Sequence, residues 1–401
     1  MISSALLEKV KTLSKKYYDL MVEIRHQIHM HPELGWEEVE TSKLIQRELN
    51  KLKIPFQLIK KIGIIATIKG QKPGKGKCLL LRADMDALPL TEETDVPYKS
   101  KIPGKMHACG HDCHTANLLG VAAILNELKD QFSGIIKFMF QPSEECGIGG
   151  ALPMIKAGIL KNPNVDAAIG LHVSNNPINT INYRREISSG CPDDFNVEIH
   201  GPGGDAGVPD QTVDVISLGA QFIAAAQTII ARQITTTRPA LITFGTFQSS
   251  STDINTIPKV VKLSGTLRCI DEDIRKSMYN KFKNLLASIC KTNGATFKFD
   301  YLWSYPPVYN DPLMCDLLLD TLSPLIGKAN LIEEEHAGLG GEDFAYISQA
   351  VPSVFYYVGA KEPNRECFSA HHPKFYVNDQ TFFPLASLSL TVMALNYLLN
   401  N

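Results

Sequence analysis

One short stretch, "HACGHDCH" at residues 107–114, holds three histidines, two cysteines and an aspartate in eight positions. Imidazole, thiolate and carboxylate groups are the side chains with which proteins bind zinc and related divalent metals. The same cluster also fits a reactive thiol or the polar start of a helix, so the rest of the chain has to supply the missing parts of a site. The sequence has no pair of C-x-x-C motifs, which argues against a structural zinc knuckle.

Further polar side chains follow apolar runs of strand length. Asp84 and Asp86 come at the end of "LLLRADMDALP", the pair Glu144–Glu145 ends "FMFQPSEE", and His172 ends "AIGLHV". In open α/β sheets, ligands bind beyond the carboxyl ends of the strands, so these groups are expected to converge. Taken alone, Asp84 and Asp86 fit turn or capping roles equally well.

Cys109, His111, Glu145, His172 and a late histidine in "SAHHPKF" together make a nitrogen, oxygen and sulfur set suited to zinc or manganese. The set is larger than one ion needs, which indicates a two-metal site that holds a bridging water. Neighbouring residues at a strand end point in different directions, so Glu144 can act as general base while Glu145 binds metal. A cysteine nucleophile would leave the glutamate pair unexplained.

The elements that must position these groups read as an α/β domain. Apolar spacing of three or four over the first 30 residues predicts a helix ended by Pro32, and Thr41 is the expected N-cap of a second helix. Strand-length apolar runs follow, with the helical pattern "CHTANLLGVAAILNELKDQF" between them. Continuous apolar strands that alternate with helices predict a mostly parallel sheet buried on both faces.

The pattern changes after about residue 185. Strand and helix signals then follow in the order β-α-β-β-α-β, which is the ferredoxin-like arrangement, before the βα alternation resumes. We therefore predict a catalytic domain in two parts, residues 1–185 and 303–401, with a smaller α+β domain inserted at 186–302. A chain of 401 residues is long enough for two domains.

Composition argues against nucleic-acid-binding, membrane and disulfide-rich proteins. The net charge of −2 offers no basic surface for nucleic acid or for an anionic membrane, and no apolar run approaches the roughly 20 residues that span a bilayer. Nine cysteines, an odd number without regular spacing, argue against a disulfide framework. We expect a cytoplasmic protein with no nucleic-acid or membrane partner.

Six motifs connect the chain with a known family. "RADMDALP", "MHACGHDCHT", "QPSEE", "GLHV", "GGEDFAY" and "AHHPKF" occur in the order and spacing of the amidohydrolase branch of the metallo-aminoacylase/carboxypeptidase superfamily, and "RHQIHMHPELGWEE" resembles its N-terminal motif. The resemblance runs from about residue 22 to residue 380. The branch includes N-acyl-amino-acid amidohydrolases, hippurate hydrolases and plant auxin-conjugate hydrolases. The resemblance implies a dimetal catalytic domain with an inserted lid that also forms a dimer.

The resemblance also implies roles for individual residues. Glu144 falls on the general base, which takes a proton from a metal-bridging water and passes it to the leaving amine, and Asp86 on a carboxylate that orients a ligand histidine. His371 is chosen over His372 because the family pattern is His-x-Pro and Pro373 follows. In the lid, "NTIP" and "SGTLR" supply the substrate-binding candidates Asn255 and Arg268. The metal-ligand positions are Cys109, His111, Glu145, His172 and His371.

One lid motif departs from the family. The usual pattern "G-x-G-G-H-A-x-x-P-H" reads "GPGGDAGVPD" here, with Asp205 and Asp210 in place of both histidines. The first family histidine reaches the partner subunit's active site and donates a hydrogen bond to the substrate carbonyl oxygen as it becomes negative. An ionised aspartate only accepts hydrogen bonds, and the loss of one such donor typically lowers turnover by about 10²–10³. Asp205 keeps the donor role if burial protonates it.

The predicted function is therefore hydrolysis of the amide bond of N-acyl amino acids, of the hippurate or N-acetyl type, by a metal-bridging hydroxide. The cofactors are two divalent ions per subunit, Mn²⁺ or Zn²⁺ with Co²⁺ and Ni²⁺ as further candidates, and the protein is expected to be a homodimer through the lid. Two alternatives stay open. One is a dipeptidase or aminopeptidase on the same scaffold. The other is a metal-binding dimer with poor activity, which Asp205 and Asp210 would favour.

Overall fold

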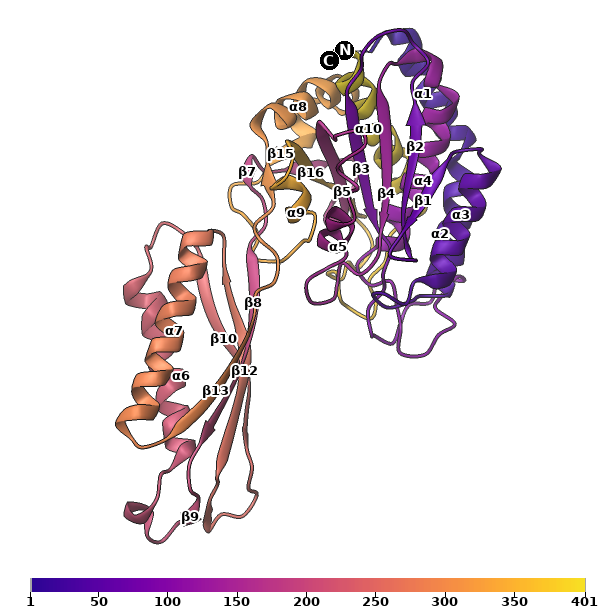
Figure 1. Ribbon diagram of the computed structural model, residues 1–401. Helices are drawn as coiled ribbons and strands as arrows, with labels where there is room; N and C mark the ends of the chain where they lie inside the picture. The colour runs from indigo at the N-terminus through magenta and orange to yellow at the C-terminus, as the bar shows by residue number, and fades with distance from the viewer. Residues whose placement is uncertain (1, 401) are drawn as a thin grey trace. The chain divides into compact units, whose positions relative to one another are not determined.

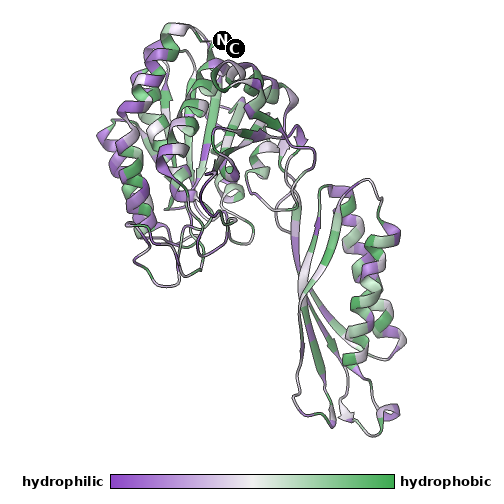
Figure 2. Ribbon diagram, turned by 180° about the vertical axis from the view of Figure 1, so that it is seen from behind, coloured by the Kyte–Doolittle hydropathy of each residue, from purple (hydrophilic) through white to green (hydrophobic). Residues whose placement is uncertain are grey.

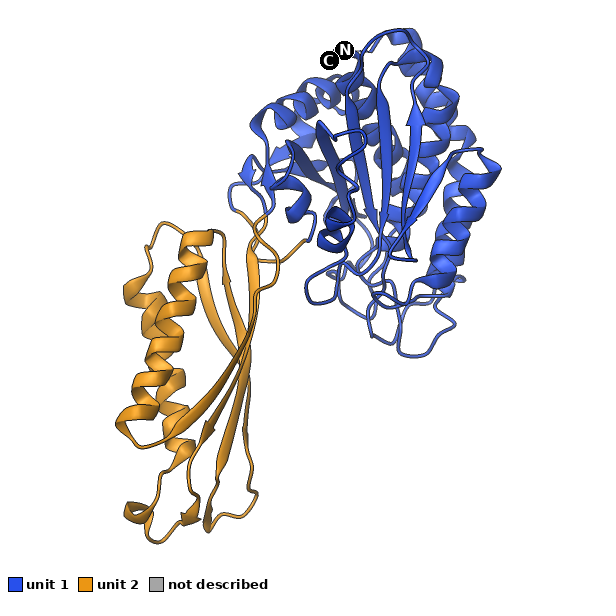
Figure 3. Ribbon diagram, in the orientation of Figure 1, with its two compact units in different colours: residues 1–188, 308–336, 343–401 blue, residues 189–307, 337–342 orange. Residues whose placement is uncertain are grey.

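The computed structural model describes residues 2–400, which form two compact units (Figure 3). Unit 1 comprises Met1–Ser188, Val308–His336 and Asp343–Asn401, and unit 2 comprises Ser189–Pro307 and Ala337–Glu342. Unit 2 therefore begins three residues after the predicted boundary and ends five residues later than predicted. It also takes in the short segment 337–342, which we had placed in the catalytic domain.

Unit 1 is built on an eight-stranded sheet with the strand order β1-β2-β4-β3-β5-β16-β6-β15 (Figure 1). The central pairs β4·β3, β3·β5 and β5·β16 are parallel, while β1 and β2 add antiparallel strands at one edge. This confirms the predicted α/β class with a mostly parallel sheet. The strands are β1 (Phe56–Ile59), β2 (Gly63–Lys69), β3 (Cys78–Asp84), β4 (Ile135–Gln141), β5 (Ala167–Pro177), β6 (Ile181–Tyr183), β15 (Leu331–Glu333) and β16 (Ser353–Lys361).

Both faces of this sheet are buried, as the unbroken apolar strands predict (Figure 2). On β3, Leu79 and Leu81 contribute to the larger core, while Cys78 and Leu80 contribute to the core of the opposite face. The larger core takes residues from α1 (Ser4–Lys16), α2 (Tyr18–Met30), α3 (Val39–Lys51), α4 (His111–Glu127), α8 (Pro312–Ile326) and α10 (Asp379–Asn400), and the opposite core from α5 (Ala151–Lys156) and α9 (Ala345–Ser348).

Two predictions about the first helices are wrong. The single helix expected over residues 1–30 is two helices, α1 and α2, which break at Tyr17. The N-cap of α3 is Glu38 rather than Thr41. The free N–H groups at this helix start are bound by Glu33 of the preceding loop, whose carboxylate accepts hydrogen bonds from the backbone N–H groups of Glu40 (3.0 Å) and Thr41 (2.8 Å).

Unit 2 has the predicted ferredoxin-like arrangement. Its antiparallel sheet has the order β10-β12-β8-β13, and α6 and α7 cover one face of it. Its elements are β8 (Cys191–His200), β9 (Gly204–Asp205), α6 (Val215–Gln233), β10 (Ala240–Ser249), β11 (Thr256–Ile257), β12 (Val260–Cys269), α7 (Glu272–Thr292) and β13 (Thr296–Leu302). The chain also has β7 (Glu186–Ile187), β14 (Tyr309–Asn310) and the 3₁₀ helices Lys129–Gln131, Pro209–Gln211 and Lys328–Asn330.

Two helices, α6 and α10, are long and apolar enough to cross a membrane by length and composition, although we had expected no apolar segment of that length. For α10, 83% of the most apolar window is buried inside the protein, as in the core helix of a globular domain. For α6 the corresponding value is 33%, and its buried residues belong to the core of unit 2.

Candidate metal centre

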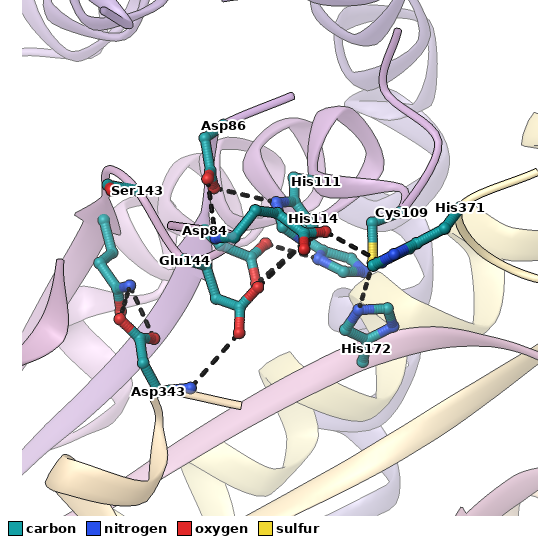
Figure 4. Close-up of polar contacts among 12 residues, drawn as sticks. Asp84, Asp86, Cys109, His111, His114, Ser143, Glu144, His172, Asp343 and His371 are labelled. Atoms are coloured by element: carbon teal, nitrogen blue, oxygen red, sulfur yellow. Dashed lines mark hydrogen bonds and ion pairs between the residues drawn. The ribbon is translucent and has the colours of Figure 1, made fainter. Parts of the chain in front are cut away.

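The side chains singled out in unit 1 converge at the edge of the sheet where β3 and β4 end (Figure 4). β3 and β4 run parallel, so Asp84 and Asp86 come close to Glu144 and Glu145, which follow the next strand. His172 comes from β5, which pairs with β3 on its other side. The prediction that His172 ends its strand is wrong, because β5 continues to Pro177 beside β16. The parallel sheet is therefore the reason why residues that are distant in the sequence share one site.

The five predicted metal ligands lie together. Two overlapping groups, Cys109–His111–His172 and Cys109–Glu145–His371, each have their donor atoms within 4.8 Å of one another. Cys109 Sγ lies 3.4 Å from His172 Nε2, and Glu145 Oε1 lies 3.2 Å from His371 Nε2. The two groups share Cys109, so the cluster has the composition and the extent of a site for two ions side by side.

The residues present fit divalent transition metals. Sulfur, imidazole nitrogen and carboxylate oxygen are combined in one buried cluster, which suits zinc and related ions. His111 Nε2 is buried and has no hydrogen-bond partner among residues 2–400, and its nearest carboxylate oxygens are 3.7–4.0 Å away. Buried polar atoms are nearly always bonded, so this nitrogen is a candidate ligand atom.

The other ring nitrogens of two ligand histidines are held by acceptors. His111 Nδ1 donates to Asp86 Oδ1 at 3.1 Å, and His172 Nδ1 donates to the carbonyl oxygen of Val173 at 2.5 Å. Each bond uses Nδ1 and leaves Nε2 as the ring nitrogen for the cluster, as is usual for metal-binding histidines. Asp86 lies where the resemblance requires a carboxylate that orients a ligand.

His114 and Asp84 contact the ligand residues and are hydrogen-bonded to each other. His114 Nδ1 donates to Asp84 Oδ1 at 2.7 Å, and its Nε2 accepts from the backbone N–H of Val173 at 2.9 Å, so both ring nitrogens are already used. The His114 ring lies 4.5 Å from the ring of His172, centroid to centroid. Asp84 is thus neither a turn residue nor a cap, because its side chain is fully buried and accepts hydrogen bonds from His114 and Arg82.

A buried ion-pair network continues from Asp84, and our sequence reading missed it. The Arg82 guanidinium donates to Asp84 Oδ2 and to Asp343 Oδ1, both at 2.7 Å, and Gln141 also donates to Asp343 at 2.7 Å. The backbone N–H of Asp343 lies 3.4 Å from Glu144 Oε1. The arginine inside the apolar run "CLLLRAD" is a signal that would have found this network, because a charged residue in a buried strand requires partners.

The electrostatics of the cluster favour a cation. Burial alone would lower the pKa of His111, yet the charges of Asp84 and Cys109 and the hydrogen bond to Asp86 raise it well above its usual value. Without an ion the site therefore favours a second proton on this ring, and a bound metal ion would displace that proton from Nε2. Burial and the neighbouring His114 ring lower the pKa of His172 to about 3, so its imidazole is neutral, as a metal ligand must be.

Two of the residues that build the site have left-handed backbones. His371 has φ +68°, with its backbone N–H bonded to the carbonyl of Ala108 at 2.8 Å, and Ser143, just before the glutamate pair, has φ +57°. Residues other than glycine adopt this conformation at a cost, and such positions cluster at functional sites. The left-handed conformations of His371 and Ser143 are therefore part of what orients the candidate ligands.

The remaining predicted site residues, Asn255, Arg268 and Asp205, all belong to unit 2. Asp205 lies on β9 next to β11 and accepts a hydrogen bond from the backbone N–H of Gly207 at 2.8 Å. Its side chain is exposed. Arg268 lies on β12 and is half-buried.

Comparison with known proteins agrees with this geometry. The profile of "Peptidase family M20/M25/M40" matches residues 80–393. The chain belongs to that family. It is 37% identical over 399 residues to thermostable carboxypeptidase 2 of Saccharolobus solfataricus, covering 98% of this chain and 99% of the relative. It is 34% identical over 408 residues to an IAA-amino acid hydrolase of Arabidopsis thaliana, covering 99% and 90%.

A solved M20 structure has the same fold. A dinuclear metal-binding peptidase of the M20 family from Bacillus subtilis superposes with a TM-score of 0.80 at 30% identity, and the match covers 96% of this chain and 100% of that one. This protein of the M20 family is thus a metal-dependent hydrolase of amide bonds, with candidate ligands for a dinuclear centre.

Proposed function

We propose that the protein hydrolyses the amide bond of N-acyl amino acids and releases a carboxylic acid and a free amino acid. The observation that carries the proposal is the division of labour in the glutamate pair. Glu145 lies with Cys109 and His371 in one group of possible ligands, and both glutamates lie with His111 in another. Glu144 is buried, and its Oε2 lies 4.0 Å from His111 Nε2. We assign Glu145 as the ligand and Glu144 as the base because, among residues 2–400, Glu145 shares a group with Cys109 and Glu144 does not. A ligand and a neighbouring base are what metal-assisted amide hydrolysis needs.

The ions would be held by the five-residue cluster already described, and Mn²⁺ or Zn²⁺ fit its donor set best, with Co²⁺ and Ni²⁺ as further candidates. When bound, they supply Lewis-acid polarisation of the attacking water and of the substrate carbonyl. Glu144 takes the proton from that water and passes it to the leaving amine nitrogen. Asp86 keeps His111 in the tautomer that binds metal.

The substrate class is supported by the names of two relatives. An IAA-amino acid hydrolase acts on an amide whose nitrogen belongs to an amino acid, and a carboxypeptidase removes the residue at a free carboxyl end. In both cases the amide nitrogen belongs to an amino acid with a free carboxylate. Arg268 has no ion pair among residues 2–400. Its guanidinium donates to two neutral oxygens, Thr266 Oγ1 and the carbonyl oxygen of Leu339, both at the long distance of 3.4 Å, so it is available for such a carboxylate. Asn255 is the proposed contact for the substrate carbonyl.

We further propose that the protein is a cytoplasmic homodimer that associates through unit 2. All nine cysteines are free thiols, which suits a reducing compartment. β10 is an edge strand, and its second half, residues 245–249, is exposed. The neighbouring helix α6 is only partly buried, so both elements offer surface for a two-fold contact. No nucleic-acid or membrane partner is proposed.

A substrate panel tests the proposal. Purified protein is treated with a chelator, loaded with Mn²⁺, Zn²⁺, Co²⁺ or Ni²⁺, and offered N-acetyl and N-benzoyl amino acids, dipeptides with a free amino end, and longer peptides. We expect amine release from the N-acyl amino acids with loaded protein only. Faster release from dipeptides or longer peptides would replace the proposed substrate by a peptidase substrate. Release from no substrate above a Glu144→Gln control would favour the metal-binding protein of poor activity.

A further inference from the structure

The loop between α2 and α3 packs directly against the turn that carries the glutamate pair. A Cβ atom added at Gly35 would lie 2.7 Å from Ser143 Oγ and 2.9 Å from Cys146 Sγ, so the loop backbone approaches the turn as closely as glycine allows. Glu33, in the same loop, also binds the start of α3 through its carboxylate. The loop is therefore tightly packed against the turn that carries the glutamate pair.

Glu38, the last residue of this loop, bonds the turn itself. Its side chain is fully buried, and Oε1 accepts a hydrogen bond from the backbone N–H of Ser143 at 2.7 Å. Ser143 has the left-handed backbone that redirects the chain from β4 towards Glu144 and Glu145. A strained conformation persists only when its surroundings hold it, and Glu38 supplies one of the bonds that do so.

The beginning of the loop is hydrogen-bonded to the segment that follows β3. The carbonyl oxygen of Glu33 accepts from the backbone N–H of Ala87 at 2.8 Å, and Leu34 forms a β-bridge with Ala87. Ala87 follows Asp86, whose Oδ2 in turn accepts from the backbone N–H of Glu145 at 2.9 Å. The loop thus connects the two chain segments that bring Asp86 and the glutamate pair into the site.

We propose that Glu38 is a positioning residue for the reaction: its bond to the Ser143 N–H fixes the turn that aims Glu144 as base and Glu145 as metal ligand. The inference deepens the proposed function and rests on it for the activity readout. Burial, and then the negative charge of Asp86, raise the pKa of Glu38 to about 8, so at neutral pH the side chain is mostly a neutral acid. Glutamine at position 38 is also neutral and keeps an oxygen acceptor, and its NH2 group takes the position of Oε2, a buried atom without a hydrogen-bond partner among residues 2–400.

Removal of the acceptor should therefore act on the site and not only on stability. Glu38→Ala leaves the N–H of Ser143 buried without its partner, and the turn is expected to shift to find another. Partners that orient metal ligands typically contribute 10–100-fold in metal affinity or activity. We expect Glu38→Ala to lower kcat and the affinity for the metal ion by about 10–100-fold each, with KM unchanged because Glu38 does not touch the substrate.

Three variants form the experiment: Glu38→Ala, Glu38→Gln and the control Glu48→Ala. Glu48 is a buried glutamate of neighbouring α3. Within residues 2–400 its side chain hydrogen-bonds Lys51 alone, at 2.7 Å, so its loss tests stability alone. For each variant we would measure kcat, KM, the melting temperature, and the affinity for Zn²⁺ by competition with a chelator. Glu38→Gln should behave as wild type, and Glu48→Ala should lose stability without losing metal affinity.

Two results would overturn the proposal. One is an alanine variant at position 38 that keeps wild-type metal affinity and kcat at a temperature where it is folded. The other is a Glu38→Gln variant that fails as badly as Glu38→Ala, because then the acceptor oxygen is not what matters. Failure of the proposed function is seen separately, since wild-type protein would then bind Zn²⁺ and release no amine from any N-acyl amino acid.

Discussion

Glu144→Gln is expected to lower kcat for N-acyl amino acids by about 10²–10⁴, the usual contribution of a general base. Glutamine has nearly the same shape and can still accept from the Asp343 N–H that holds Glu144 Oε1 at 3.4 Å. It cannot take up a proton from the attacking water. KM should change little, and metal ions should stay bound. The measurement is steady-state kinetics together with the metal content of the purified variant.

The neighbouring glutamate is the matched control. Glu145→Gln changes the same chemical group one residue further on, but it weakens a ligand of the group that also holds Cys109 and His371. We expect this variant to lose metal and activity together and to recover part of both at high metal concentration. If Glu144→Gln lost an ion in the same way, Glu144 would be a ligand and another group would have to be the base.

Asp205→His is expected to raise kcat, by up to about 10²–10³, the usual contribution of one donor to a developing oxyanion. Asp205 is exposed on β9 and its carboxylate accepts from the Gly207 N–H, so it offers an acceptor where the family places a donor. A histidine restores that donor. The measurement is kcat with the best N-acyl amino acid of the panel.

Two comparisons make this gain specific. Asp210→His changes an exposed aspartate of the same loop and should leave kcat unchanged. The double variant Glu144→Gln/Asp205→His, inactive by itself, should raise the activity of wild-type chains when the two are mixed into dimers, because the resemblance implies that residue 205 acts on the partner's site. Light scattering of the same samples checks the dimer. A loss of activity in Asp205→His would show that this aspartate has a role of its own.

The metal cluster was predictable because it depends on strand ends. Once the apolar runs that reach Asp84, Gln141 and His172 are taken as parallel neighbours, the polar residues at the ends of these runs must come together at one edge of the sheet. The choice among them came from the family motifs, which separated Cys109 and His111 from His107 and His114. The structure supplies a physical reason for one of these distinctions, since both ring nitrogens of His114 are already bonded.

The supporting contacts were not predictable in the same way. Glu38 lies in "GWEE", where a pair of glutamates reads as a solvated surface, and only the packing of the loop shows that it is buried against Ser143. Asp343 is distant from Arg82 in the sequence, and no local pattern pairs them. The prediction of Thr41 as the N-cap of α3 was wrong for a related reason. The N–H groups at the helix start are bound by Glu33, which lies outside the usual capping position.

The rest depends on the claim that five side chains hold two metal ions at the edge of the sheet where β3 and β4 end. Anomalous diffraction from crystals grown with Zn²⁺ tests it most directly. We predict two peaks per chain that share Cys109 as a neighbour, one beside His111 and His172 and one beside Glu145 and His371. A single peak, or peaks at Asp84 and His114 with Cys109 unliganded, would contradict the two-metal site and with it the proposed hydrolysis.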